Sequence, residues 1–71
     1  MSKSRQIVYR YEGKPEDDDV ILDIRGKQVI PEKGSVIHRK AKAWRVVMVA
    51  QFSASKDSPI PVITVLLTQL R

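Results

Sequence analysis

Short runs rich in Val, Ile, Tyr and Thr recur along this chain between Gly, Pro and charged breaks, and this spacing is the strongest constraint on its fold. Runs of this composition are typical of β-strands, and several of them at regular spacing favour a β-sandwich or barrel. In residues 43–52 every second side chain is apolar: Trp44, Val46, Met48, Ala50 and Phe52. A period of two places these side chains on one face of a strand, so we expect that face in the core.

The same pattern predicts five strands, at about residues 6–11, 19–30, 35–39, 43–52 and 62–70. Gly26 interrupts the second of them, either as a bulge in one bent strand or as the tight turn of a hairpin. Pro31 and Gly34 bound a turn, because proline presets one backbone angle and glycine tolerates the left-handed conformation. We expect a short hairpin at residues 40–42 and loops at 12–19 and 53–61.

The last segment, "VITVLLTQL", also has apolar residues at helical spacing: Ile63, Leu66, Leu67 and Leu70. A strand is favoured because the β-branched residues in this segment lose rotamer freedom in a helix. The whole pattern predicts an all-β fold, a small five-stranded antiparallel barrel with an SH3-like layout. An OB-like barrel is the alternative, although the connection at residues 40–42 leaves no room for its usual helix.

With 71 residues, the chain is expected to form one domain, 1–71, with a marginal core. It contains no cysteine, which excludes a disulfide framework and a thiolate metal site. The first residues lack the apolar run of a signal peptide, and no stretch approaches the ~20 apolar residues of a membrane span. We therefore expect a cytoplasmic protein that does not enter the membrane.

The composition argues against an enzyme. His38 is the only histidine, and the three glycines are too dispersed to form a phosphate-binding loop. A nucleophile would need a base and an orienting group, and His38 would have to act alone. Three consecutive aspartates, Asp17, Asp18 and Asp19, lack the alternate spacing of a calcium loop and are interpreted as a solvated acidic loop. We expect no catalytic residue, metal site, cofactor or small-molecule substrate.

Charge divides the sequence into two parts. Residues 12–23 contain six acidic residues and one lysine, whereas residues 25–45 contain seven cations and one acidic residue. The formal net charge is +5. Such a division bears on the choice of partners rather than on the fold. One hypothesis is that the acidic loop folds over the basic segment and competes there with an anionic partner.

Two surfaces could carry a function. The first is basic, and its candidate nucleic-acid-binding residues are Arg25, Lys27, Arg39, Lys40, Lys42 and Arg45. Aromatic residues are scarce, so binding there would use the phosphate backbone and have little sequence specificity. The second surface is apolar, because the last two strands carry more aliphatic side chains than one inner face needs. Its candidate protein-interface residues are Val47, Val49, Ile63, Val65 and Leu67.

Burial of aliphatic side chains is worth more than surface ion pairs, so the apolar surface ranks first. The sequence predicts a non-enzymatic binding or adaptor module that self-associates or docks on a larger assembly through its last two strands. The expected partner is a protein or a second copy of the chain. The alternative is a nucleic-acid-binding barrel that uses the basic hairpin. A third hypothesis is a small enzyme subunit without an active site of its own. For the apolar surface itself, the alternative is that the amino-terminal segment folds across it and hides it.

Overall fold

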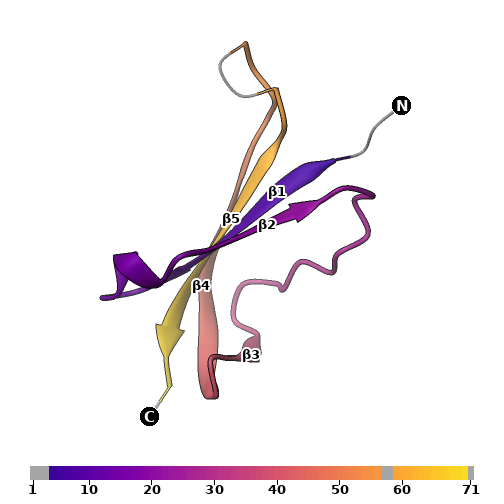
Figure 1. Ribbon diagram of the computed structural model, residues 1–71. Helices are drawn as coiled ribbons and strands as arrows, with labels where there is room; N and C mark the ends of the chain where they lie inside the picture. Colours follow the sequence, from indigo (N-terminus) through magenta and orange to yellow (C-terminus); the bar gives the residue numbers. More distant parts are fainter. Residues whose placement is uncertain (1–3, 57–58, 71) are drawn as a thin grey trace.

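The computed structural model describes residues 4–56 and 59–70, so residues 57 and 58 of the predicted loop 53–61 lie outside it. Within the described residues the chain forms five strands (Figure 1): β1 (Arg5–Tyr11), β2 (Asp19–Asp23), β3 (Val36–Arg39), β4 (Lys42–Phe52) and β5 (Val62–Gln69). A 3₁₀ turn, η1 (Pro15–Asp17), lies between β1 and β2. The all-β class is confirmed, and the last segment is a strand as predicted.

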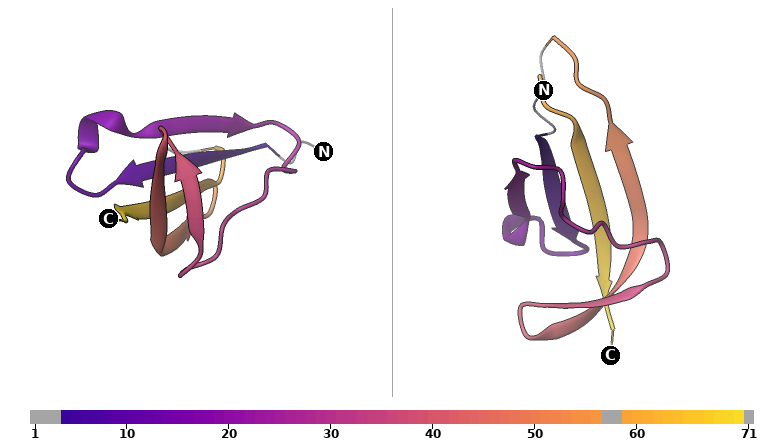
Figure 2. Two further views of the ribbon diagram at one scale, coloured as in Figure 1. Left: turned by 90° about the horizontal axis from the view of Figure 1, so that it is seen from below. Right: turned by 90° about the vertical axis from the view of Figure 1, so that its right-hand side faces the viewer.

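All five strands belong to one sheet with the order β2-β1-β5-β4-β3. Neighbouring strands pair in antiparallel fashion except β1 and β5, which are parallel. The sheet is therefore mixed, which differs from the wholly antiparallel sheet predicted from sequence. The parallel pairing arises because residues 24–35 cross the inner face before β3, β4 and β5 follow as two successive hairpins (Figure 2). The sheet curls into a half-barrel, in agreement with the predicted small barrel.

The second predicted strand, 19–30, is wrong beyond Asp23. The Asp23 carboxylate accepts hydrogen bonds from the backbone amides of Lys27 and Gln28, at 3.2 and 3.0 Å, and so turns the chain. Gly26 adopts a φ of +67° within this bend, and forms neither a bulge nor a hairpin turn. The chain then runs without regular structure to Ile30, which packs against the core.

The predicted turns on either side of β3 are confirmed. Gly34 has a φ of +91°, a conformation that side chains disfavour, and its amide donates to the carbonyl of Val46. Lys40 and Ala41 form the two-residue connection between β3 and β4, and both have positive φ. Two consecutive left-handed residues match the twist of a tight hairpin.

A bulge in β4 changes which side chains face the core. Strand register moves from Val46 opposite Leu67 to Met48 opposite Leu66, so that Val47 is the extra residue. Trp44 and Val46 lie before the bulge and are buried, as predicted. Met48 and Phe52 lie after it and are 50% and 59% exposed, so the prediction of one continuous inner face over residues 43–52 is wrong.

The core lies inside the curl of the sheet. Among the residues that the structure describes, it consists of eight buried side chains: Ile7, Tyr9, Tyr11, Trp44, Val46, Ile63, Val65 and Leu67. The aromatic rings of Tyr11 and Trp44 meet edge to face, with centroids 4.7 Å apart. Ile21, Ile30, Ile37 and Val49 pack around this group. With so few residues, the core depends on each of them for its packing.

Candidate functional site

Most of the candidate protein-interface residues prove to be part of the core. Ile63, Val65 and Leu67 are at most 6% exposed, and Val49 is half-buried against them. Of the five candidates only Val47, at 37% exposed, is open to solvent. The prediction therefore assigned the alternating residues of β5 to the wrong faces, and it placed Val49 on the wrong side because it missed the bulge.

The apolar surface lies on the opposite side of the same sheet. Strand register places Val8 of β1 between Val20 of β2 and Thr64 of β5, and Thr64 beside Ala50 of β4. In the next row Leu22, Gln6, Val62 and Phe52 are neighbours. These rows alternate with the buried rows through Ile7 and Ile63, so their side chains point away from the core.

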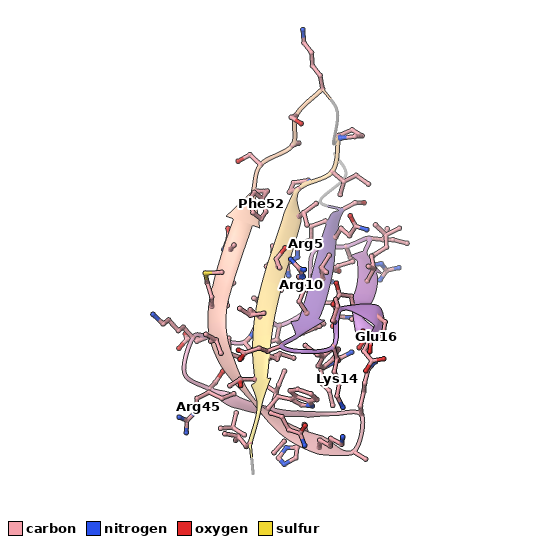
Figure 3. All side chains as sticks on the ribbon, turned by 90° about the vertical axis from the view of Figure 1, so that its left-hand side faces the viewer. Arg5, Arg10, Lys14, Glu16, Arg45 and Phe52 are labelled. Carbon is pink, nitrogen blue, oxygen red and sulfur yellow. The ribbon has the colours of Figure 1, made fainter. Side chains whose placement is uncertain are left out.

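We call this surface the outer face; its members are Val8, Val20, Leu22, Met48, Ala50, Phe52, Val62, Thr64 and Leu66. Figure 3 looks onto it, with Phe52 at the end of β4 and Arg10 on β1. Val20, Leu22, Met48 and Phe52 are all at least half exposed, and the others are half-buried by their neighbours in the sheet. No described segment crosses this side, since residues 24–35 pass over the inner face. The first strand pairs edge to edge with β5 and does not cover it.

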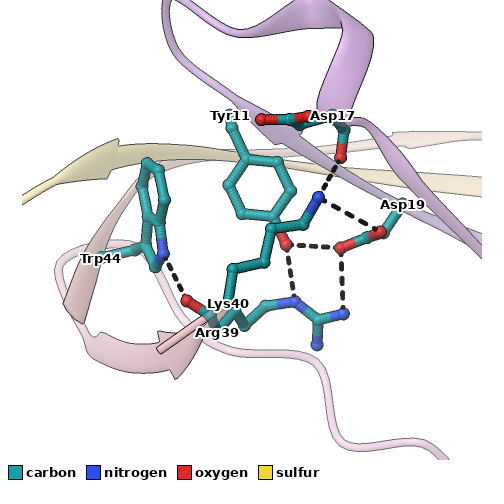
Figure 4. A network of polar contacts seen from close by, with 6 residues as sticks. All are labelled: Tyr11, Asp17, Asp19, Arg39, Lys40 and Trp44. Atoms are coloured by element: carbon teal, nitrogen blue, oxygen red, sulfur yellow. Dashed lines mark hydrogen bonds and ion pairs between the residues drawn. The ribbon is translucent and has the colours of Figure 1, made fainter. Parts of the chain in front are cut away.

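The acidic loop and the basic hairpin meet in space. Arg39 Nε donates to the Tyr11 hydroxyl at 2.8 Å, and that hydroxyl donates to Asp19 (Figure 4). Arg39 Nη2 lies 3.3 Å from Asp19 Oδ2, and Lys40 Nζ donates to the backbone carbonyl of Asp17 at 2.9 Å. The contact that the sequence suggested as a hypothesis therefore exists, while competition with an anionic partner stays a hypothesis.

This polar network affects the titration of its members. The Tyr11 hydrogen bond is the main reason that the pKa of Asp19 lies below its ordinary value. Burial, together with the hydrogen bond to Asp19, raises the pKa of Tyr11. The Arg39 guanidinium also lies over the Tyr9 ring, 4.1 Å from its centroid, where a cation is attracted by the ring face.

The network connects β2 and β3, the two edge strands between which the half-barrel is open. β2 and β3 are the edges of the sheet and do not pair with each other. Asp19 begins β2 and Arg39 ends β3, so their ion pair links the two edges at one end of the opening. The Trp44 indole nitrogen donates to the Arg39 carbonyl at 2.9 Å and holds the same corner from the core side. The arrangement is typical of a structural contact.

A second polar cluster holds the other end of β2. Arg5 Nε lies 2.9 Å from Asp23 Oδ2, and the same carboxylate accepts the two backbone amides described above. Burial alone would raise the pKa of Asp23, but the hydrogen bonds from Gln28, Arg5 and Lys27 outweigh it, and the pKa lies below the ordinary value. Asp23 therefore fixes the start of the 24–35 connection.

The six candidate nucleic-acid-binding cations do not form one patch. Arg39 and Lys40 belong to the network at Asp19, whereas Arg25 and Lys27 follow Asp23 at the opposite end of β2, about 13 Å away along the strand. Arg45 lies in register with Thr68 on the outer side of the sheet. The structure thus brings together only the cations of the β3–β4 hairpin.

Lys42, the remaining cation of that hairpin, lies next to a lysine that sequence reasoning missed. The proximity of Lys14 lowers the pKa of Lys42, through contact between the side chains and repulsion between the charges. Lys14 precedes η1, and only the folding of the acidic loop toward the hairpin brings it there. The sequence held no local signal for this approach.

His38 is exposed on β3. Within residues 4–56 and 59–70 there is no group of three or more His, Cys, Asp or Glu side chains suited to a metal ion. Among those residues there is also no helix with the length and apolar character needed to cross a membrane.

Comparison of the chain with protein-family models, with curated proteins and with solved structures found no match.

Proposed function

We propose that this chain is a non-enzymatic binding module that docks on another protein through the outer face of its sheet. One observation carries the proposal: the register of four strands gathers apolar side chains on the side opposite the core, and no described segment covers them. A soluble sheet needs only one apolar face. An uncovered second apolar face is the usual mark of a protein interface.

Magnitudes favour this face over the charged hairpin. Burying an exposed aliphatic or aromatic side chain completely contributes about 1.5–3 kcal/mol, and the outer face offers several. An exposed ion pair contributes at most about 1 kcal/mol. The molecule measures 42 × 22 × 18 Å, so its long side can supply the ~800 Å² that a stable complex needs from each partner.

The proposal can be tested by photocrosslinking in cells. Benzoylphenylalanine replaces Phe52 on the outer face or, as the matched control, exposed His38 on β3. We expect discrete adducts from position 52 that are absent from position 38 and are lost when Leu66→Lys is added. Adduct mass then distinguishes a second copy of the 8.1-kDa chain from another protein. No adduct from position 52, or the same adducts from both positions, would contradict the proposal.

Phosphate-backbone binding by the hairpin is the second candidate. It is supported by the net charge of +5 and by the closeness of Lys14 to Lys42. Arg39 and Lys40 are the neighbouring cations in the hairpin. If Arg39, Lys40 and Lys42 each met a phosphate, the slope of log K against log salt would be about −2.7. Binding of mixed DNA and RNA at low salt would support this candidate, and no binding there would remove it.

A further inference from the structure

The outer edge of β2 carries backbone groups that point away from the sheet. The Gln6 amide donates to the Pro61 carbonyl at 2.9 Å, so the backbone of Gln6 faces β5. Directions alternate along a strand, so Ile7 faces β2 and its partner Ile21 faces β1. It follows that the N–H and C=O groups of Val20 and Leu22, on either side of Ile21, point outward.

These groups have no backbone partner among the described residues, because β2 ends the sheet and no hydrogen bond reaches them. The side chains of Val20 and Leu22 are 58% and 56% exposed on the outer face. An exposed edge with apolar side chains readily pairs with another strand, and proteins usually protect such edges. In the part of the chain that the structure describes, β2 lacks that protection between Asp19 and Asp23.

Charges on either side of β2 indicate what would pair with it. Glu16, Asp17 and Asp18 precede the strand, and Arg25 and Lys27 follow it. Asp18 lies 3.4 Å from Arg10 within the same chain, so exposed Glu16 is the main acidic charge left for a second copy. In an antiparallel pair of two β2 strands, the acidic end of each lies beside the basic end of the other. A parallel pair would place like charges together. The sequence around β2 is therefore complementary to itself in the antiparallel direction.

We propose that two copies of this chain join through their β2 edges, antiparallel and about a two-fold axis at Ile21. In this register Val20 of one copy lies opposite Leu22 of the other, so that both outward-pointing residues of each strand exchange hydrogen bonds. Asp19 and Asp23 come opposite each other, but Arg39 and Arg5 already neutralise them within each copy. The two outer faces then become one continuous surface. This pairing uses the backbone of the β2 edge, so it does not depend on the docking function proposed for the outer face.

The second free edge, β3, is less suited to self-pairing. Hydrogen bonds to β4 come from alternate residues of β3, so the backbone groups of Val36 and His38 point outward. Cations lie at both of its ends, Lys33 before it and Lys40 after it. Because Glu32 lies beside Lys33, neither direction sets an acidic end against a basic one, as the flanks of β2 do in an antiparallel pair.

The first test is the mass of the intact chain by light scattering between about 1 μM and 1 mM. We expect a monomer–dimer equilibrium that Leu22→Pro weakens at least about tenfold, because proline removes the outward N–H. Edge strands tolerate such a proline, and an unchanged Trp44 fluorescence spectrum would show that the fold persists. The matched control is Met48→Lys, which alters the outer face away from the edge and should leave the dimer intact.

Amide hydrogen exchange tests the same edge without a substitution. The amides of Val20 and Leu22 should become protected as concentration rises, while that of Ile21, already bonded to β1, should be protected throughout. Protection of Val36 and His38 instead would place the contact at β3 and overturn the proposal. A chain that stays monomeric with exposed Val20 and Leu22 amides at every concentration would also overturn it.

Charge exchange tests the orientation. Glu16→Lys or Arg25→Glu alone should weaken the dimer several-fold at low salt, and the double variant should restore it; both side chains are exposed. No restoration would contradict the antiparallel arrangement. If Met48→Lys dissociates the dimer and Leu22→Pro does not, the two copies associate through the outer face. That result contradicts pairing through β2 but leaves the proposed docking function standing. If position 52 gives no adducts while the β2 dimer still forms, the proposed docking function fails and this inference stands.

Discussion

Leu66 and Leu67 are neighbours in β5 and are chemically identical, yet they lie on opposite faces of the sheet. Leu67 is completely buried between Tyr11 of β1 and Val46 of β4, its register partners. Leu66 lies half-buried on the outer face, between Arg10 and Met48. The comparison teaches that register, rather than hydrophobicity, decides which residues form the core and which remain for a partner.

The largest expected effect is a loss of stability when Leu67, the buried member of this pair, is truncated. Leu67→Ala should lower the free energy of unfolding by about 2–5 kcal/mol, because it leaves a cavity in a small core. The matched variant Leu66→Ala should cost less than about 1.5 kcal/mol, since its side chain is already partly solvated. Urea denaturation followed by Trp44 fluorescence measures both. Equal losses would show that the two faces are equally packed.

Sequence patterning and turn residues were enough to predict the all-β class, the turn at Gly34 and the hairpin at Lys40. It could not assign β5, because both faces of "VITVLLTQL" are apolar and only pairing with β1 and β4 distinguishes them. It also could not locate the bulge at Val47, since one extra residue leaves no mark in a run of aliphatic side chains. Most of the residues predicted to form an apolar interface therefore lie in the core.

The polar network shows the same limit. The acidic and basic segments were evident from composition, but their contact depends on how the half-barrel curls and brings Asp19 to Arg39. The bend at Asp23 was missed because its hydrogen bonds come from backbone amides, which carry no sequence signal.

The next effect concerns pH and the two ends of β2. The pKa values of Asp19 and Asp23 are lowered in the folded chain, so each contributes stability that is present above the ordinary carboxyl pKa of 3.8. This contribution should decrease as the pH falls below that value and vanish below the folded pKa of each group. Stability curves between pH 2 and 7, about the range in which carboxylates titrate, test this expectation.

Asn substitutions separate the two ends. Asp19→Asn and Asp23→Asn should each reduce the loss of stability that the native chain shows as the pH falls below 3.8. Asp23→Asn should lower stability at neutral pH more, because Asp23 is 6% exposed and holds two backbone amides, whereas Asp19 is 32% exposed. A loss that neither variant changes would mean that these carboxylates are not paired in solution.

The smallest effect on stability is expected from Met48→Lys on the outer face. Because Met48 is half exposed and outside the core cluster, the free energy of unfolding should change by less than about 0.5 kcal/mol. Photocrosslinking from position 52 should nevertheless be lost. Chemical denaturation and crosslinking of the same preparation provide both values. A variant that unfolds readily while keeping its adducts would reverse the assignment of the two faces.

The accessibility of the Leu66 and Leu67 methyl groups tests the assignment of the faces most directly. A soluble paramagnetic probe added to the dilute protein broadens the NMR signals of exposed methyl groups and spares buried ones. The structure predicts strong broadening for Leu66 and Met48 and none for Leu67 and Val65. Broadening of Leu67 with protection of Leu66 would contradict the register of β5, and the outer face would no longer be available for docking.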